Sequence, residues 1–547
     1  MTLLSQIAGT VARLPRVTTP RLTVSRDLAV PMPDGVVLLA DLYQPHRGQP
    51  LPPTVLVRSP YGRSGFFGFL YGRLLAERGY QVLVQSVRGT FGSGGTFDPY
   101  VNEHTDGLST VAWIRQQPWF NGTLATCGPS YLGYTQWAIA AEADLQAISI
   151  QVSTSNFHDR VYAGDSFGLW NALNWTTGIV AQEKASGRAT RLRETRRRLP
   201  AILSHLPLRD LDELATGHHV FFYQDWLEHT EGDSEYWQRR NFLPTLPQIS
   251  APICLVGGWY DIFLPWQLRD YSVLRSAGQH PYLTIGPWGH SSFGVLAASV
   301  RESLDWFDAQ LKDDHARLRR LPVRIFVSGA GEWREFPDWP PESARTASRL
   351  YLQPYGGLAS SLPPPSSPDH YRYDPSDPTP SVAGPHLSRN STPTDNRDLE
   401  ARPDVLTYTT APLPEDLLVI GSVEADLFVS SSLEHADFFA RLCDVDRRGR
   451  SINVCDALQR VRPDAPTASA GSHHLTFALW PTAHLFRRGH RLRLQVSSGA
   501  HPRYARNTGS GEPLATATTL VVAEQSIFHD PEHPSAVVLS VPTHTST

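Results

Sequence analysis

Apolar runs alternate with amphipathic stretches along the first 150 residues of the chain. The apolar runs that we expect to form strands are Val36–Tyr43, Thr54–Val57, Gln81–Val84 and Leu124–Cys127. The helix-like stretches between and after them are Leu70–Arg78, Leu108–Gln116 and Tyr131–Ala143. Strands that alternate with helices over short connections predict a mainly parallel sheet with helices on both faces.

The pattern changes near residue 151. From 151 to 245 the sequence is rich in Trp, Arg and His, with helical stretches such as Arg191–Leu203 and few strand signals. Strand signals return at Ile253–Val256 and Tyr282–Ile285, and Leu304–Leu311 has the pattern of an amphipathic helix. We therefore predict one α/β domain, residues 1–150 and 246–345, interrupted by a helical cap at 151–245.

The C-terminal part, 346–547, has a third pattern. A stretch rich in Pro, Ser and Asp at 358–393 lacks the apolar period of a helix. Short β-type runs follow at Leu417–Ile420, Ala425–Ser430, Phe438–Cys443, His474–Leu479, Arg491–Val496 and Leu520–Val522. A series of short strands with almost no helix predicts an antiparallel β-sandwich or jelly roll.

Composition narrows the classes of function. The 547 residues carry a net charge of −4, so we expect neither a nucleic-acid partner nor a membrane partner. The first 19 residues do not resemble a secretory signal, and no run approaches the ~20 apolar residues of a membrane span, so we expect a cytoplasmic protein. The four cysteines form no C-x-x-C pair, which argues against a metal site. Whether Cys443 and Cys455 pair is left open.

A serine on a predicted strand-to-helix turn is the first candidate for catalysis. Ser130 lies in the sequence Gly-Pro-Ser-Tyr-Leu-Gly, residues 128–133, between an expected strand and an expected helix. Such a turn exposes a nucleophile above the sheet, and the helix N-terminus favours a developing oxyanion. The second glycine comes one residue later than in the strict G-x-S-x-G pattern. Ser166, in Gly164–Gly168, matches that pattern better, but no convincing strand precedes it.

Two later strand ends supply an acid and a base. Asp261 follows the strand at Ile253–Val256, and His290 follows the strand at Tyr282–Ile285. The order Ser, acid, His is that of the α/β-hydrolases, in which histidine takes the serine proton and the carboxylate orients the histidine. Asp270 is a second candidate for the acid, although it falls in an expected helix.

The motifs resemble those of the cocaine esterase and X-Pro dipeptidyl-peptidase family of serine hydrolases. They are Gly-Pro-Ser-Tyr-Leu-Gly at 128–133, Gly-Trp-Tyr-Asp at 258–261, Gly-Pro-Trp-Gly-His at 286–290 and Arg-Ser-Pro-Tyr at 58–61. The resemblance implies an α/β-hydrolase domain with an inserted helical cap and a C-terminal jelly roll, with Ser130, Asp261 and His290 as the triad. It also implies an oxyanion hole formed by the Tyr61 hydroxyl and the Tyr131 N–H.

Aromatic residues near these loops are expected to line an apolar acyl pocket. They are Trp175 in the cap, Phe263 after the acid and Trp288 before the base. One position departs from the family pattern: Ser86 stands where an Asp is common, which we interpret as a lost structural ion pair or cap.

We therefore expect a serine hydrolase that cleaves a small ester or amide through an acyl-enzyme, most simply an acyl esterase. An X-Pro dipeptidyl-peptidase and an acylase or acyltransferase are the alternatives, and a non-catalytic β-sandwich binding protein is a remote one. The chemistry requires no metal and no organic cofactor. Family members are often dimers, so a homodimer is one expected assembly.

Overall fold

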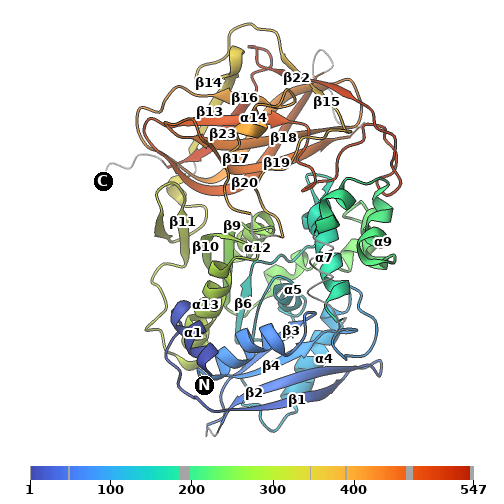
Figure 1. The fold of residues 1–547 in the computed structure, drawn as a ribbon. Helices are drawn as coiled ribbons and strands as arrows, with labels where there is room; N and C mark the ends of the chain where they lie inside the picture. The colour runs from blue at the N-terminus through green and yellow to red at the C-terminus, as the bar shows by residue number, and fades with distance from the viewer. Residues whose placement is uncertain are drawn as a thin grey trace. The chain divides into compact units, whose positions relative to one another are not determined.

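The structure is a computed structural model that describes residues 2–46, 50–183, 197–344, 346–387, 391–462 and 472–542. The chain forms two compact units, each built from several segments. Unit 1 comprises 1–158, 179–188 and 231–324, and unit 2 comprises 159–178, 189–230 and 325–547. Figure 1 shows the elements of both.

A mainly parallel sheet forms the centre of unit 1. The strands of this sheet that lie wholly within unit 1 are β1 (Leu22–Pro31), β2 (Val37–Pro45), β3 (Thr54–Ser59), β4 (Gln81–Ser86), β5 (Leu124–Pro129), β6 (Ala147–Gln151), β9 (Ile253–Tyr260) and β10 (Tyr282–Gly289). They lie in the order β1-β2-β4-β3-β5-β6-β9-β10. From β4 to β10 every neighbouring pair is parallel. Strands β3, β4, β5, β6 and β9 are buried along their whole length, as expected for strands covered on both faces.

Unit 1 also contains helices, which come from several parts of the chain. They are α1 (Leu3–Val11), α2 (Gly65–Phe67), η1 (Gly68–Arg73), α3 (Leu74–Ala76), α4 (Glu103–Arg115), α5 (Tyr131–Trp137), α11 (Glu235–Gln238), η3 (Leu243–Gln248), α12 (Leu264–Ser276) and α13 (Phe293–Lys312). Helix α5 contacts β3, β5 and β6, and α13 contacts β5, β6, β9 and β10. The single helix expected over Leu70–Arg78 is instead a π-helical turn, η1, followed by α3. A Cβ on Gly72 would lie 2.7 Å from the Tyr43 ring, so the turn is fitted closely against that side chain.

Unit 2 is rich in β-structure. Its large sheet has the order β15-β22-β17-β23-β13-β14-β16-β21-β18-β19, and β20 pairs with β17. The strands are β13 (Thr346–Gln353), β14 (Gly357–Ala359), β15 (Asp369–Tyr373), β16 (Leu406–Thr409), β17 (Leu417–Ser431), β18 (Ala436–Val445), β19 (Ser451–Val461), β20 (His473–Phe486), β21 (Arg491–Ser497), β22 (Ala523–Phe528) and β23 (Ala536–Val541). All the pairs are antiparallel except β14 with β16.

Shorter elements complete unit 2. They are the hairpin β7 (Tyr162–Ala163) and β8 (Ser166–Phe167), and the helical elements η2 (Leu208–Asp210), α9 (Leu211–Thr216), α10 (Phe221–Glu228), η4 (Glu342–Ala344), η5 (Pro354–Gly356) and α14 (Arg397–Glu400). Helices α6 (His158–Val161) and α7 (Leu169–Ala181) cross boundaries between the units, as does strand β11 (Val323–Val327), which β12 (Glu332–Phe336) follows. Of the helix expected at Arg191–Leu203, residues 191–196 lie outside the described residues, and 197–203 are helical.

The structure corrects two predictions for the β-rich part. The runs Leu417–Ile420 and Ala425–Ser430 are one strand, β17, because an irregularity in its pairing at Gly421 bends the ladder without ending it. Leu520–Val522 is not a strand: it lies in a loop in which the Val521 N–H bonds to the Thr508 carbonyl, and β22 begins only at Ala523. All four cysteines are free and buried, including Cys443 and Cys455.

Within the described part of the chain, no helix has both the length and the apolar character needed to cross a bilayer.

Candidate active site

Ser130 lies on a sharp turn between β5 and α5. Its φ of 59° and ψ of −123° are unusual for a residue with a side chain, which is typical of a nucleophile turn. The turn is held by a bond from the Ser130 N–H to the Gln151 carbonyl, at 2.9 Å, on the neighbouring strand β6. The Ser153 hydroxyl donates to the Ser130 carbonyl at 2.8 Å.

The glycines at 128 and 133 leave the space that this turn requires. A Cβ on Gly128 would lie 2.5 Å from the Leu132 Cβ, and a Cβ on Gly133 would lie 2.5 Å from the Ser153 Cβ. Gly133 therefore gives the start of α5 its close approach to the chain after β6. Gly133, which comes one residue later than in the strict pattern, therefore has a steric role in the structure.

Asp261 and His290 come from the next strands of the sheet. Tyr260 of β9 and Gly289 of β10 are register partners, so the residues that follow them leave the sheet side by side. Asp261 is completely buried, and its Oδ1 accepts the Phe263 N–H at 2.8 Å. Its Oδ2 lies 2.7 Å from His290 Nδ1.

The three side chains form one hydrogen-bonded line. His290 Nε2 lies 3.0 Å from the Ser130 Oγ, and His290 Nδ1 lies 2.7 Å from Asp261. A histidine that donates its Nδ1–H to a carboxylate has Nε2 available to accept a hydroxyl proton. The structure thus brings together the three residues that the sequence analysis selected, with the polarity needed to activate a serine.

A buried network, which the sequence analysis missed, lies beside the turn. The Tyr131 hydroxyl donates to Glu103 Oε1 at 2.8 Å and accepts the Tyr100 N–H at 3.0 Å. Glu103 Oε2 forms an ion pair with Arg58 Nη2 at 3.0 Å, and Arg58 Nη1 donates to the Glu103 carbonyl at 2.7 Å. Arg58 Nε donates to Gln85 at 3.0 Å.

The network joins the segments that carry both expected oxyanion donors. Arg58 is on β3, three residues before Tyr61, and Tyr131 directly follows Ser130. Burial raises the pKa of Glu103, while the Arg58 charge and the Tyr131 hydrogen bond lower it. A buried ion pair with these additional hydrogen bonds fixes geometry more than it adds stability.

Tyr61 lies just beyond the end of β3, which is the neighbour of β5 in the sheet. Its N–H bonds to the Ser59 hydroxyl at 3.0 Å, and its ring stacks on Phe67 at 5.5 Å. Arg63 anchors the same loop: its Nε pairs with Asp41 at 3.2 Å, and its Nη1 donates to Ser86 at 3.3 Å. Ser86 thus accepts a hydrogen bond from an arginine that has its own carboxylate partner.

The expected pocket aromatics have different surroundings. Phe263 is buried, and its ring centroid lies 5.5 Å from that of His290. Trp288 packs its indole over glycines: a Cβ on Gly286 or on Gly294 would lie within 2.5 Å of it. Trp175, on α7, packs on Phe222 and Trp226, each at 5.7 Å. The structure therefore places Phe263 against the base, and the pocket roles of Phe263, Trp175 and Trp288 all stay predictions.

The alternative candidates for the nucleophile and the acid, Ser166 and Asp270, are buried in contacts away from the triad. Ser166 is completely buried in the two-residue strand β8, and the preceding Gly164 packs so closely on Leu458 that a Cβ would lie 1.7 Å from its carbonyl oxygen. Asp270 is buried within α12, where it accepts the Ser155 N–H at 2.8 Å and the Ser155 hydroxyl at 2.7 Å. Neither residue contributes to the hydrogen-bonded line at Ser130.

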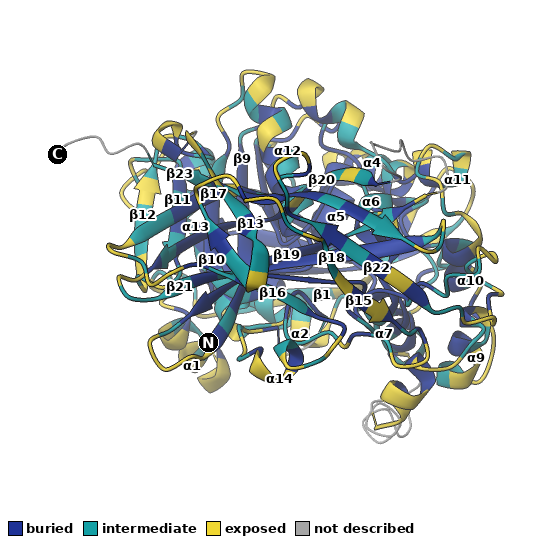
Figure 2. Ribbon diagram, turned by 90° about the horizontal axis from the view of Figure 1, so that it is seen from above, coloured by how far each residue is buried: buried dark blue, intermediate teal, exposed yellow. Residues whose placement is uncertain are grey.

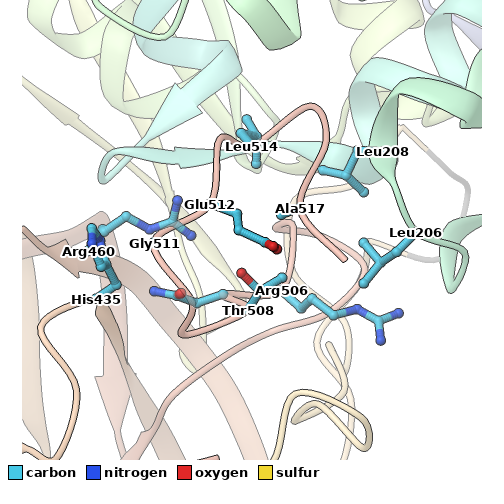
Figure 3. Close-up of a pocket in the computed structure, with 11 residues that line it drawn as sticks. Leu206, Leu208, His435, Arg460, Arg506, Thr508, Gly511, Glu512, Leu514 and Ala517 are labelled. Carbon is cyan, nitrogen blue, oxygen red and sulfur yellow. The ribbon is translucent and has the colours of Figure 1, made fainter. Parts of the chain in front are cut away.

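A separate cavity of about 120 Å³ lies within unit 2. Figure 3 shows its lining, with the Glu512 carboxylate in the middle and leucines at 206, 208 and 514. Glu512 accepts the N–H groups of Thr518 and Thr519, which lower its pKa to about 2. The cavity includes none of the predicted site residues. No group of three His, Cys, Asp or Glu side chains among the described residues is arranged to hold a metal ion.

Comparisons with known proteins identify the families and relatives that this chain resembles. Residues 34–292 match the model of the X-Pro dipeptidyl-peptidase (S15) family, and 317–538 match that of the X-Pro dipeptidyl-peptidase C-terminal non-catalytic domain. The chain is 32% identical to the cocaine esterase of Rhodococcus sp. (strain MB1 Bresler), over 95% of this chain and 98% of that protein.

Solved structures show the same fold. An aminopeptidase from a marine sediment Thaumarchaeota archaeon has a TM-score of 0.81 at 23% identity, over 97% of this chain and 99% of its own. An α-amino acid ester hydrolase has a TM-score of 0.77 at 23% identity, over 96% of this chain and 98% of its own.

Fold and relatives define the class: the protein is an α/β-hydrolase with a β-rich C-terminal domain, a serine hydrolase of the esterase and peptidase kind. The chain belongs to the cocaine esterase and X-Pro dipeptidyl-peptidase (S15) family.

Proposed function

We propose that this chain is an acyl esterase that works through a Ser130–His290–Asp261 triad and a covalent acyl-enzyme. The observation that carries the proposal is the hydrogen-bonded line of 3.0 Å and 2.7 Å from the Ser130 hydroxyl through His290 to Asp261. Ester substrates are favoured because the cocaine esterase of Rhodococcus is 32% identical over nearly the whole chain.

The mechanism follows from the geometry of the three side chains. Ser130 Oγ attacks the acyl carbonyl while His290 Nε2 takes the hydroxyl proton, and the buried carboxylate of Asp261 stabilises the imidazolium. The Tyr61 hydroxyl and the Tyr131 N–H are the proposed donors to the oxyanion. His290 then protonates the leaving alcohol, and a water molecule repeats the sequence on the acyl-enzyme to release the acid.

Replacement of the nucleophile tests the proposal directly. Ser130→Ala should lower kcat on p-nitrophenyl acetate by at least about 10⁴-fold, because the remaining residues have no attacking group to activate. Ser166→Ala is the matched control, since it removes the serine of the strict pattern, and it should retain activity. Full activity of the Ser130→Ala protein would refute the proposed mechanism.

Peptidase activity is the second candidate, since residues 34–292 match the X-Pro dipeptidyl-peptidase model. The same triad can cleave an amide, and the choice depends on groups that hold the substrate's free amine. Comparison of kcat/KM for p-nitrophenyl acetate and for an X-Pro-p-nitroanilide separates the two activities. A higher value for the anilide would replace the esterase proposal with the peptidase one.

A further inference from the structure

The N-terminal helix α1 exposes its large apolar side chains. Leu3, Leu4, Ile7 and Val11 are 73%, 61%, 52% and 56% exposed. At 100° per residue, these four positions fall within an arc of about 100° on one face of the helix. Figure 2 shows α1 largely in the colour of exposed residues.

The opposite face of α1 attaches the helix to the rest of unit 1 through small residues. Ser5 is completely buried and donates to Glu77 Oε1 at 3.1 Å, and Ala12, directly after the helix, is 7% exposed. A surface helix ordinarily buries its large apolar residues and exposes its small and polar ones. Helix α1 does the reverse, and a contiguous exposed apolar face of this kind marks an interaction surface.

The segment that follows the apolar face of α1 in the sequence carries positive charge. Residues 1–26 contain four arginines and no Asp or Glu. Arg26 is paired with Asp41, while Arg13, Arg16 and Arg21 are exposed in the segment that follows the helix. We expected no membrane partner from the net charge of −4 of the whole chain, but that sum conceals the local excess of positive charge in residues 1–26.

From this combination we infer that α1 attaches the protein to an anionic lipid surface. The apolar face enters the boundary between headgroups and acyl chains, and the arginines contact lipid phosphates. Nine residues are too few to span a bilayer, so the helix lies in the plane of the interface. Charge disfavours a second copy of the chain as the occupant, because pairing two α1 faces would bring like-charged arginine segments together.

Vesicle sedimentation of the full chain tests the inference. The protein should pellet with vesicles of equal parts phosphatidylglycerol and phosphatidylcholine at low ionic strength, and remain in solution with pure phosphatidylcholine or at high salt. Arg13→Gln with Arg16→Gln should weaken the partition coefficient about 5-fold per arginine. Leu4→Ser with Ile7→Ser should abolish binding at any salt concentration.

Matched controls come from elsewhere on the surface. Leu362 is 61% exposed, the same as Leu4, so Leu362→Ser should leave binding unchanged, as should Arg448→Gln at another exposed arginine. Hydrolysis of p-nitrophenyl acetate in solution should be equal for all variants, which shows that they are folded. Absence of binding to the anionic vesicles would overturn the inference, as would a dimer that Leu4→Ser dissociates without any lipid binding.

Discussion

The Tyr131 hydroxyl occupies a central position in the buried network beside the nucleophile. It bridges the Tyr100 N–H and the Glu103 carboxylate, and that carboxylate pairs with Arg58. Since Tyr131 follows Ser130 directly, the hydroxyl anchors the backbone N–H that we propose as an oxyanion donor. The side chain thus holds the turn while the main chain contacts the substrate.

Tyr131→Phe should destabilise the protein without removing any proposed catalytic group. Loss of the hydroxyl removes one hydrogen bond from a buried carboxylate oxygen of Glu103 and one from the buried Tyr100 N–H, and we expect a cost of about 1–3 kcal/mol in the free energy of unfolding. Urea unfolding measures the loss, and Tyr355→Phe, at a fully exposed tyrosine, should show none. Equal stability of the two variants would mean that the network does not hold the turn.

The residues of the candidate site differ in how far the sequence reveals them. Ser130, Asp261 and His290 each follow an apolar strand-like run, so their local pattern indicates a place at one edge of the sheet. Glu103 has no such signal, because its partners Arg58 and Tyr131 are 45 and 28 residues away and the contacts depend on the packing of α4 against β3 and α5. A buried carboxylate at a helix start looks like an ordinary helix-start acid in the sequence.

At the scale of elements, the junction of β5 and α5 controls the position of the nucleophile. The strand enters the turn through Gly128, whose φ is 146°, and the helix leaves it through Gly133. The strict sequence pattern describes one spacing of these glycines, but what the turn requires is room for Leu132 and for Ser153. Gly133 leaves room for Ser153, which explains why the turn forms although this glycine comes one residue later than in the strict pattern.

Gly133→Ala should displace the turn. Its Cβ would lie 2.5 Å from the Ser153 Cβ, and relief of such overpacking costs about 1–3 kcal/mol and moves the start of α5. We expect at least about a 10-fold loss in kcat on p-nitrophenyl acetate, because small displacements of a catalytic group reduce rates steeply.

Gly178→Ala is the control for this substitution. Gly178 lies within α7, and its added Cβ would meet no atom within 4 Å, so this variant should be as stable as the parent or more so. A Gly133→Ala protein with full activity and stability would contradict the steric account of the turn.

The type of an element was predictable wherever the apolar periodicity was strong. The residue at which an element stops was not predictable. Strands β3, β4, β5, β9 and β10 begin at the predicted residues and run two to four residues further, because the catalytic loops start only where the sheet pairing ends. The helix expected at Tyr131–Ala143 stops at Trp137, and the continuous β17 was predicted as two strands. These ends depend on tertiary packing and on a bulge, neither of which an apolar pattern encodes.

At the scale of the whole molecule, one buried and one partly buried histidine make stability depend on pH. In unit 2, burial lowers the pKa of His386 to about 4, and the Arg503 charge adds to the effect. Burial, with the Arg506 charge, also lowers the pKa of His501 to about 4. The unfolded chain takes up these protons near pH 6.5 and the folded chain only near pH 4, so acidification between these values favours unfolding.

His501→Gln should weaken this acid sensitivity. Between pH 7 and pH 4 the free energy of unfolding of the parent should fall more than that of the variant, by on the order of 3 kcal/mol, which is the linkage for one such shift. Urea unfolding at several pH values measures the difference. His370→Gln, at an exposed histidine, should follow the parent, and parallel curves for the parent and His501→Gln would contradict the lowered pKa of His501.

Identification of the serine that becomes covalently modified tests the central claim most directly. The protein should react with a fluorophosphonate, and mass spectrometry of the digested product should find the adduct on Ser130, because its hydroxyl lies 3.0 Å from a histidine that is held by the completely buried carboxylate of Asp261. Asp261→Asn should slow the labelling by orders of magnitude. An adduct on Ser166 or on another residue, or an active protein that never reacts at Ser130, would contradict the account.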